Sequence, residues 1–256
     1  MMKDNENVTV VIATHNNAKT IEKALQSVTK GIRPANNVII GDNDSKDGTY
    51  DVLCKLLGAE PVTIDEKTGL PPQFDGNLNG IPVKIFRKQL STTGDTLNVA
   101  IQMQWQGVTL FGFMDPTSWY APDKIAQTIR VCAIQPSIAC VVSDCDNHHP
   151  DGRVERVFRN SFDMQRLLAS FPYDRNFIMR PQIFTKLKQG FNPQMPTRDD
   201  YDLFLKMSEI GLIYHIPAPL HNNVVSQISE EEQQSITQCE MAARQMAAQR
   251  RGTSNE

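Results

Sequence analysis

The chain alternates short apolar runs with segments of helical periodicity, and polar stretches follow several of the apolar runs. Apolar runs rich in β-branched residues predict buried strands, and they cover residues 8–13, 38–41, 83–87, 108–114 and 137–144. Apolar residues at helical spacing predict helices, and these cover residues 21–28, 48–58, 95–105, 123–134 and 198–211. Because strands alternate with helices, we expect an α/β fold with a mostly parallel sheet and crossover helices.

Residues that favour caps and turns mark several element ends. Asn16 and Asn17 can cap the first helix, and Gly58 can close the second. The pattern breaks at residues 60–93, where "TGLPPQFDGNLNGIP" predicts a long loop or a small hairpin. Residues 230–251 predict a polar helix with no evident packing partner, and we expect the final "QRRGTSNE" to fray.

Length and composition limit the classes of protein to consider. With 256 residues and a net charge of −3, the chain suffices for one large domain or two small ones and is no generic polyanion binder. No apolar run approaches the roughly 18–20 residues of a membrane-spanning helix, and the N-terminal "MMKDNENVTVV" lacks the apolar region of a signal peptide. We therefore expect a soluble, cytoplasmic protein.

The cysteines argue against a disulfide framework and against a zinc site. They are five in number, widely scattered and without a CxxC pair. Four of them lie in apolar surroundings and are expected to be small core residues. The five are Cys54, Cys132, Cys140, Cys145 and Cys239.

Three polar segments each follow a predicted strand: "THNN" after residues 8–13, "DNDSKDGT" after 38–41 and "DPTSWYAPD" after 108–114. In a parallel sheet the carboxyl ends of strands lie at one edge, so these segments are expected to converge on one crevice. The alternative for "DNDSKDGT" is a surface turn, since turns favour Asp, Asn, Ser and Gly.

Five motifs in this order resemble those of the family 2 glycosyltransferases of the GT-A type. They are Thr14-His15-Asn16, residues 42–49, the segment from Gly94 through Asn98 to Ala100, "FMDPTSWYAPDKI" (113–125) and "DDYDLFLK" (199–206). The resemblance covers roughly residues 8–226. It implies a GT-A fold, with a Rossmann-like, mostly parallel central sheet flanked by helices in a single domain.

The resemblance also implies a division of the chain. Residues 1–229 would form the glycosyltransferase domain, with a nucleotide-sugar half at about 8–120 and an acceptor half at about 121–229. Residues 230–256 would add a C-terminal helix and a frayed tail.

By the same resemblance, a nucleotide-sugar donor, with a UDP-sugar as the first expectation, would lie across the crevice. Asp42 would accept hydrogen bonds from the base or the ribose, because a carboxylate suits N–H and hydroxyl donors. Thr14 would line the base pocket, with His15 nearby. The full set implied for the donor is Thr14, His15, Asn16, Asp42, Asn43, Asp44 and Asp115.

The "DDYD" segment would supply a general base. Asp200 would remove the proton from the acceptor hydroxyl as that hydroxyl attacks the anomeric carbon, which gives inversion. Asp199 would raise the pKa of this base by its like charge. The alternative for Asp199 is a stabilising role at a helix N-terminus, and Asp202 is expected to be structural or solvated.

The metal motif departs from the family's pattern. A divalent Mn²⁺ or Mg²⁺ would bridge the donor diphosphate and stabilise the leaving group. Asp115 provides one carboxylate, but Thr117 stands where the family has a second, and Thr is a poor ligand for these ions. Either the metal is held weakly by Asp115 and the donor phosphates, or another residue substitutes, with His221 the nearest candidate.

Other polar residues are expected to be structural. Asp47, with Gly48 and Thr49, has the composition of a turn and cap. His215 lies in a strand-like run. His148 and His149 lie in a polar turn and are expected to face solvent.

The acceptor is the least specified part of the reaction. Residues 151–198 carry nine Lys and Arg against four Asp and Glu. This excess favours an anionic acceptor, either a saccharide or a hydroxylated base in phage-type DNA. Alternatively, the arginines pair with surface acids or with the donor diphosphate. The cations are Arg153, Arg156, Arg159, Arg166, Arg175, Arg180, Lys186, Lys188 and Arg198, and Arg244, Arg250 and Arg251 could extend the same face.

The sequence leaves two alternatives to an active inverting glycosyltransferase. A nucleotide-sugar-binding relative with weak or lost catalysis would explain Thr117. A nucleotidyltransferase would usually carry a glycine-rich basic loop near its N-terminus, and "ATHNNAKT" is not one.

Overall fold

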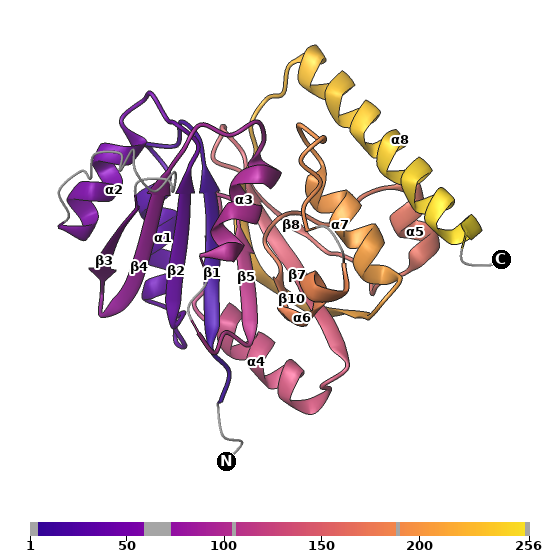
Figure 1. Ribbon diagram of the computed structural model, residues 1–256, viewed down its shortest axis with the longest axis horizontal. Helices are drawn as coiled ribbons and strands as arrows, with labels where there is room; N and C mark the ends of the chain where they lie inside the picture. Colours follow the sequence, from indigo (N-terminus) through magenta and orange to yellow (C-terminus); the bar gives the residue numbers. More distant parts are fainter. Residues whose placement is uncertain (1–4, 59–72, 104–105, 188–189, 254–256) are drawn as a thin grey trace.

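The computed structural model describes residues 5–58, 73–103, 106–187 and 190–253. These residues form one ten-stranded sheet that runs through both halves of the chain, with helices on both faces (Figure 1). The strands are β1 (Val8–Thr14), β2 (Asn37–Asp42), β3 (Gln73–Leu78), β4 (Ile81–Arg87), β5 (Leu110–Met114), β6 (Trp119–Tyr120), β7 (Ile138–His148), β8 (Val154–Val157), β9 (Ile178–Met179) and β10 (Leu212–Val224). The helices are α1 (Ile21–Thr29), α2 (Thr49–Leu57), α3 (Thr93–Gln102), α4 (Lys124–Ile134), α5 (Met164–Ala169), α6 (Gln182–Lys186), α7 (Asp199–Ser208) and α8 (Glu230–Thr253). The α/β prediction and the single domain are confirmed.

The strand directions bring several carboxyl ends to one edge of the sheet. Strands β4, β2, β1 and β5 pair in parallel in that order. Strand β9 is antiparallel to both β5 and β7, so β7 and its parallel neighbour β10 run in the same direction as β5. The sheet is therefore mostly parallel, and loops from six strands can meet above it.

Alternation along the strands fills two cores, one on each face of the sheet. In β1, Val8, Val10 and Ile12 join the core beneath α1 and α2, whereas Val11 and Ala13 join the opposite one. A strand buried on both faces needs apolar residues at nearly every position, which explains the run "VTVVIA".

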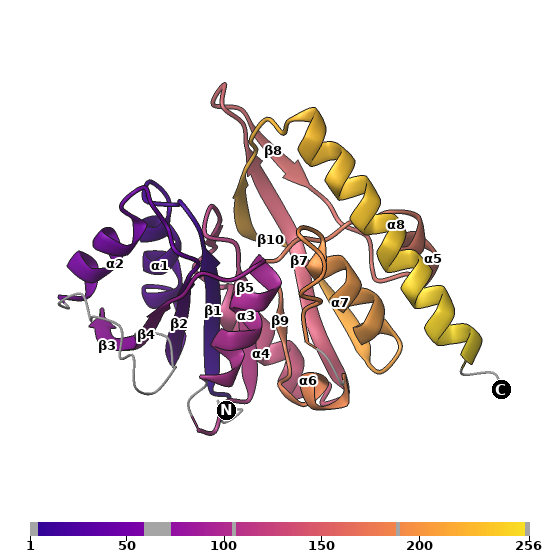
Figure 2. The ribbon, with the colours of Figure 1, turned by 45° about the horizontal axis from the view of Figure 1, so that its top comes forward.

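Helix α8 packs against α7, so the prediction of a helix without a partner is wrong. Figure 2 shows α8 lying along α7 at the outer end of the sheet. Its buried stripe consists of Cys239, Ala243 and Ala247. These small residues recur every four positions, which brings one helix face close to its neighbour.

Other expectations at element ends had different outcomes. Helix α1 begins at Ile21, and Asn17 contacts its start only through its backbone carbonyl oxygen, which accepts the N–H of Ile21 at 3.0 Å. The Asn16 and Asn17 side chains accept from Lys46 and from Thr14 and His15 instead, so the predicted side-chain cap is wrong. The small hairpin is confirmed as β3 and β4, which turn through Asn79 and Gly80, both at positive φ. The fraying predicted for residues 249–256 is wrong for residues 249–253, because α8 continues as a helix to Thr253. Residues 59–72, residues 254–256 and the predicted helix end at 104–105 lie outside the described residues.

All five cysteines are buried and unbridged. Among the described residues, no helix combines the length and the apolar character that a bilayer span requires.

Candidate active site

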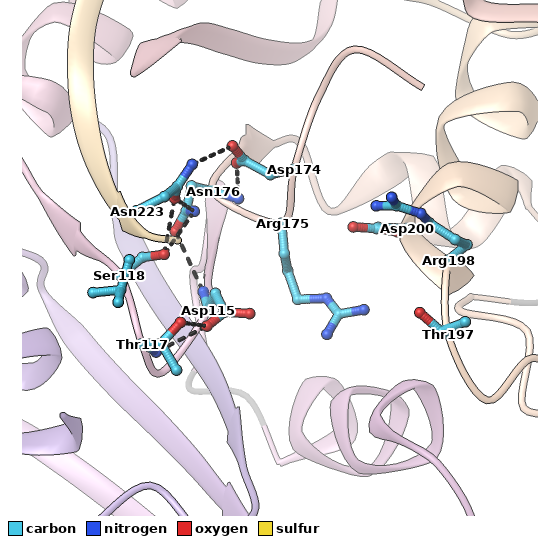
Figure 3. Close-up of a pocket in the computed structure, with 11 residues that line it drawn as sticks. Asp115, Thr117, Ser118, Asp174, Arg175, Asn176, Thr197, Arg198, Asp200 and Asn223 are labelled. Carbon is cyan, nitrogen blue, oxygen red and sulfur yellow. Dashed lines mark hydrogen bonds between the residues drawn. The ribbon is translucent and has the colours of Figure 1, made fainter. Parts of the chain in front are cut away.

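Two cavities adjoin at the carboxyl edge of the sheet, and they share Asp115, Thr117 and Arg175. The first cavity, of about 330 Å³, is also lined by Thr14, His15, Asn43 and Thr96. The second cavity, of about 260 Å³, is also lined by Ser118, Asp174, Asn176, Arg198, Asp200 and Asn223, and is drawn in Figure 3. The structure therefore brings Thr14 and His15, predicted for the base pocket, together with Asp115 and with Asp200, the predicted general base.

The loops that follow β1 and β2 are cross-linked by hydrogen bonds. Nδ1 of His15 lies 2.6 Å from the carbonyl oxygen of Asn43, and since a carbonyl only accepts, the ring nitrogen donates. The backbone N–H of Asn16 donates to Ser45 Oγ at 2.9 Å, and that of Asn17 to Thr49 Oγ1 at 2.8 Å. The Asn residues expected to cap α1 thus fix one wall of the first cavity.

Asp47 belongs to the same set of cross-links. Its Oδ1 accepts from the N–H of Thr49 at 3.0 Å, and its Oδ2 accepts from the N–H of Ala18 at 3.0 Å. The prediction of a turn-and-cap role for Asp47 is confirmed.

Asp42 lies behind this wall rather than in it. Its side chain is fully buried, accepts a short hydrogen bond from Ser45 Oγ and lies 3.3 Å from Nε of Arg87. Burial raises its pKa, against the effects of Ser45 and Arg87. Asp44 pairs with Lys46 at 2.7 Å and with Arg87 at 3.3 Å. Direct contact of Asp42 or Asp44 with a donor stays a prediction.

Thr117 acts as a hydrogen-bond donor to Asp115. Its backbone N–H and its Oγ1 both donate to Asp115 Oδ1, at 2.8 and 2.6 Å. Asp115 would hold a divalent metal at this edge, with donor phosphate oxygens and water completing the set of ligands. That set suits Mg²⁺ or Mn²⁺, which often bind through one or two carboxylates plus substrate phosphates.

Three acids begin helix α7, and their surroundings differ. Asp199 forms a short ion pair with Arg175, and Asp202 pairs with Lys206 at 2.5 Å. Asp200 lines the second cavity, and within the described residues its carboxylate accepts only the N–H of Tyr201, at 2.9 Å. Burial raises the pKa of Asp200 to about 6, with the like charge of Asp199 adding to the shift and Arg175 opposing it.

The position of α7 depends on α3 and α8. Gly94 lies so close to Asp199 that an added Cβ would sit 2.9 Å from the carboxylate. Asn98 holds the preceding loop at Phe191 by two backbone hydrogen bonds, of 2.8 and 3.0 Å. Arg198, the N-cap of α7 at φ +59°, pairs with Glu240 of α8 at 3.2 Å.

A buried network supports the floor of the second cavity. Asp174 Oδ2 accepts from Arg159 at 2.6 Å, from His221 Nε2 at 2.9 Å and from Asn223 at 3.0 Å. Burial opposes its ionisation, but His221 and Arg159 hold the pKa of Asp174 well below its usual value. Lys124 donates to the carbonyl oxygen of Asn176 at 2.9 Å, and burial lowers its pKa to about 8.

His221 belongs to this network, and its role as a metal ligand stays a prediction. Its Nδ1 lies 3.1 Å from Ser143 Oγ, and its Nε2 contacts Asp174. Ligand atoms of Cys145, Asp174 and His221 lie within 4.8 Å of one another. Arg159, however, donates to both Cys145 Sγ and Asp174, so a protein cation already occupies this group.

The other histidines are also engaged. His215 pairs with buried Asp144 at 2.7 Å, so its structural assignment is confirmed. The His148 ring contacts the Trp119 ring, with ring centres 4.7 Å apart and planes tilted by 50°, and His149 pairs with Glu155 at 2.9 Å. Both rings are half-buried, so the prediction that they face solvent is wrong.

Most of the predicted basic face is neutralised by ion pairs. Arg153 contacts Glu155, Arg156 contacts Asp146, Arg159 contacts Asp174, Arg175 contacts Asp199, Arg180 contacts Glu6 and Arg198 contacts Glu240. Arg244, Arg250 and Arg251 of α8 likewise pair with Glu240 or Glu209. Several partners lie outside residues 151–198, which is why the local charge excess overstated the exposed positive charge. Lys188 lies outside the described residues.

Sequence reasoning missed the triplet Asp174-Arg175-Asn176. The predicted site residues follow strands, whereas this triplet precedes β9, which is antiparallel to β5 and so begins at the carboxyl edge. The signal that could have found it is a charged triplet immediately before the short apolar run of residues 177–179.

Comparisons with known proteins agree with this architecture. Residues 9–74 match the sequence profile described as "Glycosyl transferase family 2". The chain is 25% identical over 222 residues to a chondroitin synthase of Pasteurella multocida (strain Pm70), a match covering 85% of this chain and 20% of that protein. A hyaluronan synthase of Pasteurella multocida matches to the same extent. The chain thus spans about a fifth of the length of these curated relatives.

Solved structures show the same fold. S. aureus TarS 1-349 in complex with UDP-GlcNAc has a TM-score of 0.67 at 15% identity, over 88% of this chain and 60% of that one. The mannosyltransferase PcManGT from Pyrobaculum calidifontis, in complex with GDP-Man and Mn²⁺, has a TM-score of 0.59 at 17% identity, over 88% of this chain and 58% of that one.

Proposed function

Because the chain belongs to the family 2 glycosyltransferases and has their GT-A fold, we propose that it transfers a sugar from a UDP-sugar to an acceptor hydroxyl with inversion. The observation that carries this proposal is the pairing of the two cavities. The first has the cross-linked wall of Thr14, His15 and Asn43, and the second contains Asp200. Asp115 and Arg175 line both.

The nucleoside would lie in the first cavity and its diphosphate at the junction, beside Asp115. The acceptor hydroxyl would enter the second cavity beside Asp200. As its oxygen bonds to the anomeric carbon, the bond from that carbon to the diphosphate oxygen breaks. Asp200 takes the hydroxyl proton, and a base whose pKa is about 6 is ionised at neutral pH yet basic enough to accept it.

Asp115 is the residue that would hold a divalent metal, and the metal would add positive charge beside the leaving diphosphate. The single carboxylate and the Thr117 hydrogen bonds favour weak binding that needs the donor's own oxygens. The presence of Mn²⁺ in the solved mannosyltransferase supports a divalent metal as the cofactor.

A saccharide is the acceptor that the observations favour. The relatives named above are chondroitin and hyaluronan synthases. The ion pairs that neutralise most of the basic face weaken the case for a hydroxylated base in DNA, which would need exposed cations for its phosphates.

The test measures sugar transfer, or slow hydrolysis of the donor, with several UDP-sugars. The released UDP reports turnover, and NMR gives the anomeric configuration of the product. We expect turnover to be lost in Asp200→Asn and retained in Asp202→Asn, a matched change of a buried acid on the same helix that pairs with Lys206 instead. Tight UDP binding without transfer or hydrolysis would favour the alternative, a nucleotide-sugar-binding relative with lost catalysis. A product of retained configuration would contradict the single-base mechanism.

A further inference from the structure

Arg175 lies at the junction of the two cavities and next to Asp115. Figure 3 shows its side chain reaching between Asp115 on one side and Asp200 on the other. It lines both cavities, and 15% of its side chain stays exposed although most of it is enclosed. A cation at this junction lies beside any ligand that spans the two cavities.

The hydrogen-bonding capacity of this guanidinium is largely unused. A guanidinium carries five N–H donors in a fixed planar arrangement. Among the described residues, its one hydrogen-bond partner is Asp199, and Nε is buried without a partner. Buried polar groups without partners are uncommon in folded proteins and call for an explanation, such as a ligand.

The backbone around Arg175 is anchored on both sides. Asp174 accepts three side-chain hydrogen bonds, and Asn176 donates to Ser118 at 3.2 Å and to Asn223 at 3.0 Å. Phe177, the next residue, is fully buried. The guanidinium is thus held in place before a ligand arrives, which is what makes a fixed charge effective at a reacting group.

The neighbouring metal motif makes a protein cation useful here. The chain has one carboxylate where the family pattern has two, because Thr117 donates to Asp115 instead of adding a ligand. A weakly held metal leaves more of the diphosphate charge to be balanced by the protein. Guanidinium groups suit this task because they bind phosphate oxygens by paired, charge-assisted hydrogen bonds.

We propose that Arg175 binds the diphosphate of the nucleotide-sugar donor and stabilises it as the leaving group, alongside any metal held by Asp115. The inference rests on the proposed function, since it places the diphosphate at the junction. Asp199 keeps its bond to Nη2, while the N–H donors of the guanidinium that Asp199 does not use meet the phosphate oxygens. Arg175 is then a catalytic residue that supplies charge at the bond that breaks.

The test compares binding of UDP and uridine by calorimetry, in excess EDTA and again with Mn²⁺. In EDTA the wild type should prefer UDP over uridine, and Arg175→Gln should lose roughly tenfold or more of that preference, the range expected for hydrogen bonds to charged groups. Uridine affinity should stay constant, which shows that the first cavity is intact. Arg175→Lys should restore part of the preference for UDP, because Lys restores the positive charge but not the paired N–H donors of a guanidinium.

Arg175→Gln also leaves Asp199 buried without its partner, so folding needs a control. The double variant Arg175→Gln with Asp199→Asn removes both charges and should show the same loss of UDP preference. Asp199→Asn alone should keep it. Equal losses for UDP and uridine, or no loss for either, would overturn the proposal and leave Arg175 as a structural partner of Asp199.

These outcomes are separable from the fate of the proposed function. An active wild type whose Arg175→Gln variant binds UDP normally refutes the role of Arg175 alone. A wild type that prefers UDP through Arg175 but shows neither transfer nor hydrolysis refutes the activity alone. A wild type that prefers neither UDP nor GDP over the nucleosides overturns both.

Discussion

Replacing Asp200 by Asn should abolish most turnover and, at the same time, make the folded protein more stable near neutral pH. The carboxyl group ionises near pH 3.8 when exposed, but burial, with the like charge of Asp199, raises its pKa to about 6 in the folded state despite Arg175. Folding above that pH therefore places a charge where the protein disfavours it. A raised acid pKa contributes stability that is complete below about pH 3.8 and is lost as pH rises through about 6.

The magnitude follows from the displacement of the pKa. Each pK unit corresponds to about 1.4 kcal/mol, so the ionised carboxylate costs up to about 3 kcal/mol at pH 8. The Asn side chain keeps the size and cannot ionise. The free energy of unfolding of Asp200→Asn should exceed that of the wild type by up to this amount at pH 8, and the gap should shrink towards pH 4.

Urea unfolding at a series of pH values measures this gap, with Asp202→Asn as the control. Turnover at pH 8 should fall by about 10²–10⁴-fold, the usual contribution of a general base, while the affinity for the donor changes little. A stability gap that does not vary with pH would refute the raised pKa. Near-full activity in the variant would refute the catalytic role itself.

The remaining predictions follow from the same contacts. The turnover of the wild type should fall on the acid side of its pH–rate profile near pH 6, where Asp200 becomes protonated. Asp199→Asn should move this acid limb to lower pH and should cost less turnover than Asp200→Asn. An acid limb that does not move would show that the like charge of Asp199 is irrelevant. Thr117→Asp should tighten Mn²⁺ binding in the presence of UDP, and Asp115→Ala should abolish it; full wild-type activity in excess EDTA would contradict any need for metal. Ala243→Asp would bury a charge in the contact between α7 and α8, and a loss of about 2–4 kcal/mol is expected in urea unfolding; an unchanged midpoint would mean that α8 does not pack as described.

The sequence predicted the first half of the site well because its strands are regular and parallel. Asp115 follows β5 and Thr14 ends β1, so a rule about the carboxyl ends of strands finds both. What this rule could not show is which polar side chains face a ligand and which fasten the loops. Asp42 has the right chemistry for a ligand, but Ser45 and Arg87 occupy its carboxylate. The Asn17 side chain likewise accepts from Thr14 Oγ1 and from the N–H of His15.

The second half was harder to predict because its key residues depend on pairings far apart in the chain. Arg175 reaches the site through an antiparallel strand of two residues, β9, which has no periodic signal of its own. The neutralised basic face likewise depends on distant partners, since Arg180 pairs with Glu6 and Arg198 with Glu240. A count of charges along the sequence cannot detect such pairs.

The surroundings of the three acids of α7 weigh against a purely structural reading of "DDYD". Acids in the first turn of a helix are favourable because of the helix dipole, and that explanation treats the three alike. In the structure, however, the surroundings of the three acids differ. Asp199 is paired with Arg175 and Asp202 with Lys206, and both face away from bulk solvent. Asp200 is the acid that lines a cavity while making no ion pair among the described residues. Burial raises the pKa of Asp200 in spite of the nearby Arg175 and Arg198, so its ionised form costs stability. Its position in the second cavity gives that cost a catalytic reason.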